Sequence, residues 1–300
     1  MKKAPLSGVF APIVTVFDDR QAIRVCDIEE NIRIYNETAL SGYMPLGSNG
    51  EFQGLTDDES LTVLRAVCRV RAPGKLVVGG CGRESTVKTL ELIKKVADEG
   101  LDYAFVLPPS YFVHQMTDEG IYRFYIEIAD KSPIPIVIYN APKFSAGFDV
   151  SPALASRLSV HPNIAAIKNS SQRPNSDYTL IISAGNFDVI AGNIGNFYSG
   201  LRQGALGGVL STASYLPDYC CALYDLVKSG DYIKAEALNS MLQDVSKHTA
   251  GPFGVAGVKC AMDALGMKGG RVRLPLIDLA PEKALEFAAV FSAHGIKAAP

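Results

Sequence analysis

Apolar runs alternate with amphipathic segments along most of this chain, and this alternation restricts its fold more than any other feature. Continuous apolar runs are typical of strands that a parallel sheet buries on both faces. Eight strands separated by helices therefore predict an α/β protein, a (β/α)8 TIM barrel. The predicted strands are residues 8–17, 42–46, 75–80, 103–107, 134–139, 163–168, 187–191 and 206–210, and helical segments include 57–71, 85–99, 118–130 and 151–159.

Helix boundaries can be located from local sequence signals. Thr56 and Glu59 have the spacing of a capping box, and Gly100 follows a helix that should end near residue 99. A doubly wound open sheet is the alternative fold. No G-x-G-x-x-G pattern follows the first predicted strand, which disfavours that alternative.

The pattern changes after the eighth apolar run, because helical segments then follow one another without strands between them. These segments are 218–229, 232–247, 252–265 and 281–291. The first of them would complete the barrel, and the other three exceed what a barrel needs. We therefore expect a barrel over residues 1–230 and a C-terminal helical extension over residues 231–300.

Composition excludes several classes of function. The 300 residues carry a net charge of −2 without a basic stripe, so neither nucleic acid nor an anionic membrane is an expected partner. The apolar stretch at 9–16 is broken by Pro12, and we expect no signal peptide and no membrane span. The six scattered cysteines form no C-x-x-C pair, which indicates reduced thiols, a cytoplasmic protein and no metal site.

Lys168 is the first candidate for catalysis, because it closes the apolar run that begins at Asn163. The carboxyl ends of barrel strands carry the active sites of this fold. Burial there would lower the pKa of the ammonium, and a neutral amine can attack a ketone to form a Schiff base. The competing interpretation is a lysine whose amine extends from the strand end into solvent.

Tyr139 also ends a predicted strand, one βα unit before Lys168. Adjacent parallel strands lie about 4.8 Å apart, so both side chains could reach one substrate. A phenol in that place can move protons to and from a Schiff-base intermediate. A core tyrosine with a bonded hydroxyl is the alternative.

The segment Gly-Ser-Asn-Gly-Glu at 47–51 predicts a tight turn between strand and helix. Small residues there would present backbone N–H groups to a carboxylate. The Ser48 hydroxyl could bind that carboxylate and relay a proton. The same four residues are also typical of an ordinary turn without a function. Glu51 is expected to be a structural partner within the turn.

Together these residues resemble the dihydrodipicolinate synthase / N-acetylneuraminate lyase family. The resemblance is carried by three motifs, in order and spacing: 47–51, Ile-Tyr-Asn-Ala-Pro at 138–142, and Ile-Lys at 167–168. It extends to the tail, with Phe-Gly-Val-Ala-Gly-Val-Lys at 253–259. The resemblance implies a barrel with a C-terminal helical extension, a homotetramer, no cofactor, and pyruvate or another 2-oxo acid bound as a Schiff base.

The resemblance also implies roles for individual residues. Lys168 matches the Schiff-base lysine, and Tyr139 matches the tyrosine that moves the proton. Ser48 falls in the proton relay and carboxylate site, with Asn49 beside it in the same turn. Tyr111 matches a tyrosine that, in several members, enters the site of the neighbouring subunit.

Departures from the synthase branch bear on the substrate. That branch carries an arginine where this chain has Phe144, preceded by Lys143, so a bidentate fork for a second carboxylate is missing. Its lysine-inhibited members also place two histidines where this chain has Asp57 and Ser60, so we expect no feedback by lysine.

The 4-hydroxy-2-oxoglutarate aldolase branch is the nearest resemblance. Ser170, two residues after the lysine, resembles a serine that contacts a distal carboxylate. Gly192 and Asn193, at the end of the seventh strand, complete the expected substrate-binding set together with Ser48, Asn49 and Phe144.

Four functions remain open on these grounds. The first is a class I lyase that cleaves a 4-hydroxy-2-oxo acid, such as 4-hydroxy-2-oxoglutarate, to pyruvate and an aldehyde. The second is the 4-hydroxy-tetrahydrodipicolinate synthase reaction, and the third is an aldolase or dehydratase acting on a deoxy sugar acid. The fourth is a non-catalytic 2-oxo-acid sensor, which release of pyruvate from a substrate would exclude.

Overall fold

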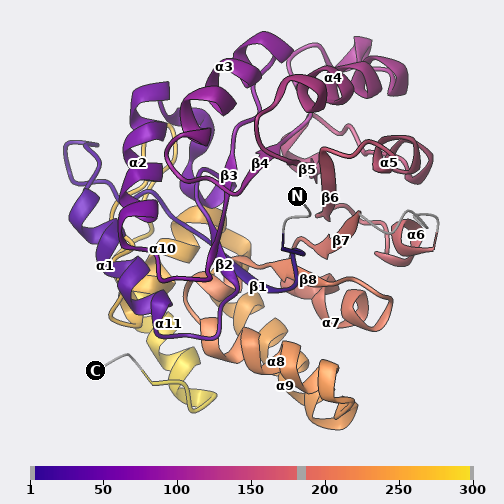
Figure 1. Cartoon of the computed structure of the whole chain (residues 1–300). Helices are drawn as coiled ribbons and strands as arrows, with labels where there is room; N and C mark the ends of the chain where they lie inside the picture. The colour runs from indigo at the N-terminus through magenta and orange to yellow at the C-terminus, as the bar shows by residue number, and fades with distance from the viewer. Residues whose placement is uncertain (1–3, 181–186, 298–300) are drawn as a thin grey trace. The chain divides into compact units, whose positions relative to one another are not determined.

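A computed structural model describes residues 4–180 and 187–297. Its strands follow one another from β1 to β8 in a closed barrel, with helices between them along the chain (Figure 1). The predicted (β/α)8 fold is therefore confirmed. The strands are β1 (Gly8–Pro12), β2 (Gly42–Met44), β3 (Leu76–Gly80), β4 (Tyr103–Val106), β5 (Ile136–Asn140), β6 (Ile164–Asn169), β7 (Asp188–Ala191) and β8 (Gly207–Val209).

The helices include the C-terminal segments expected from the sequence. None of the helices within the described ranges is long and apolar enough to cross a membrane. Their bounds are α1 (Val25–Asn36), α2 (Asp57–Val70), α3 (Thr86–Ala97), α4 (Asp118–Lys131), α5 (Pro152–Ser159), α6 (Ser176–Thr179), α7 (Ile194–Arg202), α8 (Pro217–Ser229), α9 (Tyr232–His248), α10 (Gly254–Ala264) and α11 (Glu282–Ala293).

The chain divides into two compact units, and the first contains Met1–Gly8 and Leu76–Val209. It holds β3 to β8 and α3 to α7, and each strand pairs in parallel with the next. All five residues of β5 are buried, as a strand covered on both faces requires. This unit contains the carboxyl ends of β4 to β7, where most of the predicted site residues lie.

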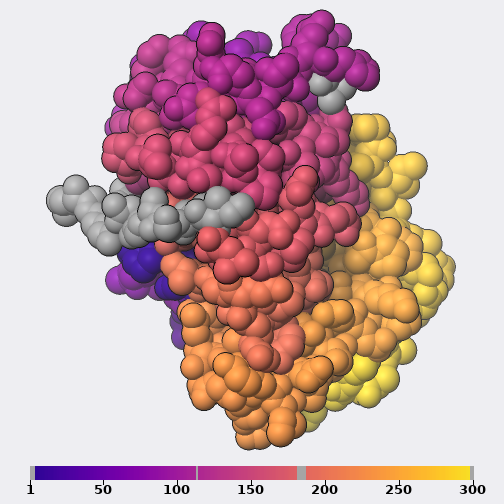
Figure 2. All heavy atoms as spheres, turned by 90° about the vertical axis from the view of Figure 1, so that its right-hand side faces the viewer, coloured from indigo at the N-terminus to yellow at the C-terminus, as the bar shows by residue number. Residues whose placement is uncertain are grey.

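The second unit contains Val9–Lys75 and Leu210–Pro300. In it β1 pairs in parallel with β2, while α8 contacts α9 and α10 contacts α11. Figure 2 shows the orange and yellow atoms of these C-terminal helices packed together. The boundary expected at residues 230 and 231 stays a prediction.

Local sequence signals act as expected in most places. Thr56 accepts a hydrogen bond from Glu59 N at 3.2 Å and completes the predicted capping box of α2. Gly100 adopts a positive φ of 95° after α3. The first strand is shorter than predicted and ends at Pro12. Residues 13–17 remain buried but continue outside the strand.

Candidate active site

Lys168 and Tyr139 are direct neighbours across β5 and β6, because their Cα atoms are register partners in the parallel pair. The Lys168 side chain is buried, with 5% of its surface exposed, and its Nζ lies 4.2 Å from the centroid of the Tyr139 ring. The Phe105 ring of β4 is 5.3 Å from the same Nζ. The structure thus brings together the two residues that the sequence singled out first.

The surroundings of Lys168 lower the pKa of its amine. Burial is the largest cause, and the opposing effects are the electrostatic attraction and the hydrogen bond of Tyr139. Lowering this pKa raises the fraction of neutral amine at a given pH, and only the neutral amine is a nucleophile. The arrangement can therefore support attack on a carbonyl carbon.

Ser170 and Gly192 meet beside the carboxyl end of β6. The Ser170 Oγ is buried and has no hydrogen-bond partner among the residues that the structure describes. A Cβ added at Gly192 would lie 1.9 Å from that oxygen, so only glycine fits there. A buried hydroxyl without a partner is costly, and a substrate oxygen could satisfy it.

Asn193 has a local role in this geometry. Its side chain accepts a hydrogen bond from Asn196 N at 3.0 Å, and the two residues form a capping box at the start of α7. The described contacts of Asn193 are therefore those of a helix cap. Its predicted contact with substrate stays a prediction.

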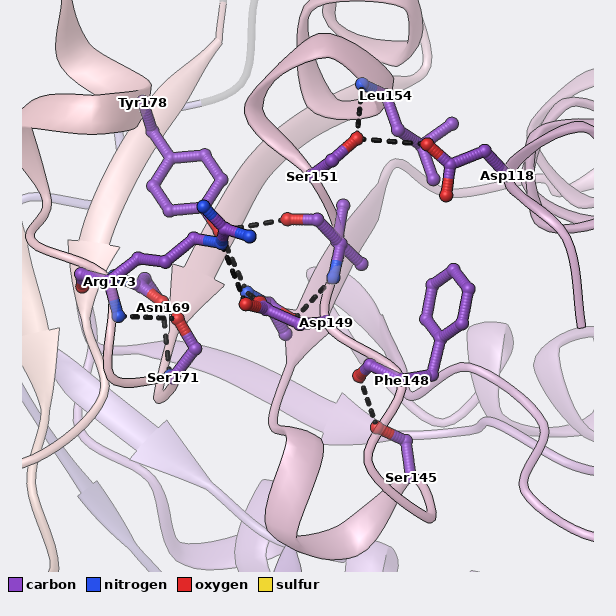
Figure 3. Close-up of polar contacts among 12 residues, drawn as sticks. Asp118, Ser145, Phe148, Asp149, Ser151, Leu154, Asn169, Ser171, Arg173 and Tyr178 are labelled. Atoms are coloured by element: carbon purple, nitrogen blue, oxygen red, sulfur yellow. Dashed lines mark hydrogen bonds and ion pairs between the residues drawn. The ribbon is translucent and has the colours of Figure 1, made fainter. Parts of the chain in front are cut away.

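Phe144 lies in a short turn after β5 and is 46% exposed. Its described contacts are with the turn itself and with Lys143, whose Nζ is 5.9 Å from the ring centroid. Ser145 Oγ closes this turn by donating to Phe148 O at 2.9 Å (Figure 3). The side chain available at the predicted specificity position is thus an exposed aromatic ring.

Tyr111 is 79% exposed and packs edge-on against Phe112, with ring centroids 5.0 Å apart. The backbone of its loop is anchored, because the Glu84 carboxylate accepts hydrogen bonds from Ser110 N and Tyr111 N, each at 3.0 Å. Both rings of this pair are therefore largely exposed on an anchored loop. Whether Tyr111 enters a neighbouring subunit stays a prediction.

Ser48 and Asn49 belong to the second unit, where they form the turn that the sequence predicted. This turn is a single 3-10 turn, Ser48–Gly50, and Asn49 Nδ2 donates to Ser211 Oγ at 3.0 Å. Thr15 Oγ1 donates to Gly50 O at 2.7 Å and anchors the end of the turn. The turn is therefore fixed by contacts from distant parts of the chain.

Glu51 is the expected structural partner, and the structure identifies what it binds. Its φ is 53°, in the left-handed region, and its carboxylate accepts hydrogen bonds from Lys259 Nζ and Arg273 N. Lys259 is buried in α10 and also donates to Thr15 O at 2.7 Å. The sequence contained a hint of this contact, since the tail motif 253–259 ends in that lysine, but its spacing of 208 residues from Glu51 gave no way to pair them.

No group of three or more His, Cys, Asp or Glu side chains is placed to hold a metal ion within residues 4–180 and 187–297. The Lys168 amine and the Tyr139 phenol lie together at the ends of β5 and β6, and the buried Ser170 hydroxyl directly follows β6. These groups suit covalent and acid–base chemistry on a carbonyl compound.

Comparison with known proteins relates this geometry to a family. Residues 5–294 match the Dihydrodipicolinate synthetase family. A 4-hydroxy-tetrahydrodipicolinate synthase of Methanothrix thermoacetophila is 30% identical over 277 residues, 92% of each chain. A relative in Emericella nidulans, named "Probable 4-hydroxy-2-oxoglutarate aldolase, mitochondrial", is 29% identical over 298 residues, 97% of this chain and 96% of its own.

Solved structures agree with the sequence comparison. The chloride-inhibited dihydrodipicolinate synthase from Acinetobacter baumannii, solved with pyruvate, has a TM-score of 0.88 and 26% identity over 97% of this chain and 99% of its own. The chain is thus a carbon–carbon lyase built on a (β/α)8 barrel. It belongs to the dihydrodipicolinate synthetase family, as the sequence resemblance implied.

Proposed function

We propose that this lyase cleaves a 4-hydroxy-2-oxo acid to pyruvate and an aldehyde through a Schiff base on Lys168. The observation that carries the proposal is the burial of Lys168 against the Tyr139 ring, with Nζ 4.2 Å from its centroid. A buried amine beside a phenol has both the nucleophile and the proton carrier that this reaction needs. The solved complex of a related synthase with pyruvate also supports pyruvate as the bound 2-oxo acid.

The reaction then follows from elementary carbonyl chemistry. The neutral Lys168 amine adds to the C2 ketone, and loss of water from the carbinolamine leaves an iminium ion. Removal of the proton from the C4 hydroxyl, through Tyr139, lets the C3–C4 bond break and releases the aldehyde. The electron pair of that bond enters the iminium as an enamine, which is protonated at C3 and hydrolysed to pyruvate and free lysine. The iminium is the electron sink, so the reaction itself calls for no cofactor.

The remaining predicted residues would bind the substrate. We assign the distal end of the substrate to Ser170, while the contact of Ser48 and Asn49 with the carboxylate next to the ketone stays a prediction. The Ser170 Oγ supports this assignment, because it is buried against Gly192 and the described residues supply it with no hydrogen-bond partner. Asn193, which follows β7 directly after Gly192, would also contact the substrate.

Phe144 favours the aldolase reaction over the synthase reaction. An arginine fork binds a second carboxylate in two parallel hydrogen bonds, and an exposed aromatic ring cannot replace it. This disfavours the semialdehyde of the synthase reaction. Because 4-hydroxy-2-oxoglutarate also carries a second carboxylate, we assign that carboxylate to Ser170 and place this compound first among substrates, with glyoxylate as the second product. The relative from Emericella nidulans supports this choice by its name.

The synthase reaction is the second candidate, and one observation favours it. The relative from Methanothrix thermoacetophila, at 30% identity, is a 4-hydroxy-tetrahydrodipicolinate synthase. That reaction would condense pyruvate with aspartate semialdehyde on the same lysine. The two candidates therefore share the Schiff base and differ in the second carbonyl compound.

Two measurements on one preparation test the shared Schiff base and separate the two reactions. Borohydride added with pyruvate should reduce the Schiff base, inactivate the protein and leave a stable pyruvyl adduct on Lys168 in the mass spectrum. The value of kcat/KM for 4-hydroxy-2-oxoglutarate cleavage should exceed that for the semialdehyde condensation. A higher value for the condensation would replace the aldolase assignment by the synthase, while label on another lysine would contradict the Schiff-base site.

We further propose that the chain is a cytoplasmic homotetramer in which Tyr111 completes a neighbouring site. The exposed Tyr111 and Phe112 rings support this, because such a pair can pack against another subunit. Mixing inactive Tyr111→Phe subunits with inactive Lys168→Ala subunits should restore part of the activity. Mixed assemblies without any activity would contradict the sharing.

A further inference from the structure

Asn140 and Asn169 directly follow Tyr139 and Lys168, and they are register partners at the ends of β5 and β6. Both side chains are fully buried. An asparagine amide offers two donors and an acceptor, so a buried one must find several partners. The partners of these two amides connect the loops that follow the two strands.

Asn140 closes the base of the loop after β5. Its Oδ1 accepts a hydrogen bond from Val150 N at 2.9 Å, and its Nδ2 donates to Asp149 Oδ1 at 2.8 Å. The same Nδ2 donates to the hydroxyl of Tyr178 at 2.9 Å, and this hydroxyl donates to Val150 O at 2.8 Å. The loop that carries Phe144 is therefore held at its base by the residue after Tyr139.

Asn169 closes the loop after β6, as Asn140 does for the loop after β5. Its Oδ1 accepts hydrogen bonds from Ser171 N at 3.1 Å and Ser171 Oγ at 2.8 Å. Its Nδ2 donates to Arg173 O at 2.8 Å and to Asn175 Oδ1 at 3.1 Å. The residue after Lys168 thus shapes the loop that begins with Ser170.

An ion pair joins the two loops. Figure 3 shows the Arg173 side chain reaching toward Asp149, and its Nε donates to Asp149 Oδ2 at 2.7 Å. Ser170 N donates to Asn140 O at 2.8 Å on the strand side. The contacts therefore form a closed circuit, which we call the asparagine clamp: Asn140, Asp149, Arg173 and Asn169.

We propose that the asparagine clamp is a positioning device for the Schiff-base pair, an inference that rests on the proposed function. The clamp fixes the two residues that follow Tyr139 and Lys168, and each strand end transmits this placement to the preceding side chain. Arg173 is its accessible member, with a side chain 42% exposed. Breaking its ion pair should loosen both loops without removing any group that touches the substrate.

Arg173→Gln in the full chain tests the clamp, with Arg157→Gln as the matched control. Arg157 lies in the same unit and is 47% exposed, and its partners, Glu119 at 2.9 Å and the ring of Tyr122, both belong to α4. We expect Arg173→Gln to lower kcat for pyruvate release about tenfold while KM changes less than about twofold, because small displacements of reacting groups cost rate rather than affinity. Both variants should lose the same small amount of Tm.

Two further variants show whether the ion pair itself is responsible. Asp149→Asn retains an acceptor for Asn140 but loses the charge, so its kcat should match that of Arg173→Gln. The double variant should lose no more kcat than either single variant, since both substitutions break the same ion pair. Arg173→Lys preserves a cation and should recover most of the wild-type kcat.

The titration of Lys168 provides a readout that does not depend on turnover. Competitive acetylation with limiting acetic anhydride, followed by mass spectrometry across pH, reports the pKa of this one amine. We expect this pKa to move toward its ordinary value in Arg173→Gln and to stay unchanged in Arg157→Gln. If the titration of Lys168 is unchanged in Arg173→Gln, the proposed positioning role of the clamp is wrong, whatever the effect on kcat. If the wild-type protein forms no adduct with pyruvate, the proposed function fails, while the acetylation result still decides about the clamp.

Discussion

Among the residues that the structure describes, two lysines are buried, one in each unit, and their surroundings differ in kind. Lys168 is 5% exposed and lies against the rings of Tyr139 and Phe105. Lys259 is 1% exposed and donates to the Glu51 carboxylate and to the carbonyls of Thr15 and Arg271. Burial is the largest cause that lowers the pKa of each amine.

The groups that oppose this lowering differ between the two lysines. For Lys259 the first opposing cause is the charge of Glu51, and for Lys168 it is Tyr139. A carboxylate and two carbonyls satisfy an ammonium and hold it in place, whereas a phenol also serves as a proton carrier. Burial alone therefore does not distinguish the two lysines, whereas the chemical nature of their partners does.

The sharpest test of the comparison is to remove the chemistry of Lys168 while retaining a cation. Lys168→Arg should abolish turnover and the borohydride-trapped adduct, because a guanidinium does not deprotonate in proteins. The exposed Lys131, replaced by arginine in the same way, is the control and should leave both unchanged. Turnover by Lys168→Arg would break the distinction between the two lysines.

A second test addresses the partner rather than the amine. Tyr139→Phe preserves the ring but removes the hydroxyl, so kcat should fall by about 10²–10⁴, the scale of general acid–base catalysis. Binding of pyruvate should weaken much less. A near-normal kcat in steady-state assays would show that Tyr139 has only a packing role.

Lys259→Met should affect folding instead. Removing one partner of a buried ion pair leaves Glu51 uncompensated and typically costs about 3–5 kcal/mol. Denaturant unfolding of the wild type and the variant measures this loss. The double variant Glu51→Gln with Lys259→Met should recover part of it, and an unchanged stability in the single variant would contradict the structural role.

Lys168→Met should have the smallest effect on stability, and with the opposite sign. The folded-state pKa of Lys168 is lowered, so below the ordinary value of 10.5 the unfolded chain binds more protons at this site. The wild type therefore gains stability as pH rises through this window, and the lysine is a cost at lower pH. The variant should be more stable than the wild type at neutral pH, with a difference that shrinks toward pH 10.5 in unfolding measurements. A difference independent of pH would exclude this explanation.

Short-range patterns predicted much of the fold and the position of Tyr139 beside Lys168. The apolar run that ends at Lys168 forms a strand, and Thr56 caps α2 as its spacing indicated. Adjacent strands of a barrel must place their ends side by side, so the position of Tyr139 next to Lys168 followed from the alternation of elements. Family motifs provided roles for these residues that spacing alone left open.

Side-chain partners across long separations were decided only by the tertiary structure. Glu51 pairs with Lys259 across 208 residues, and Asp149 pairs with Arg173 across 24. A charged or amide side chain can be satisfied by many groups, so its sequence neighbourhood does not specify which one the packed chain brings within hydrogen-bonding distance. Periodicity and capping act over a few residues and are legible in the sequence, whereas the choice of a buried polar partner depends on where every other element has packed.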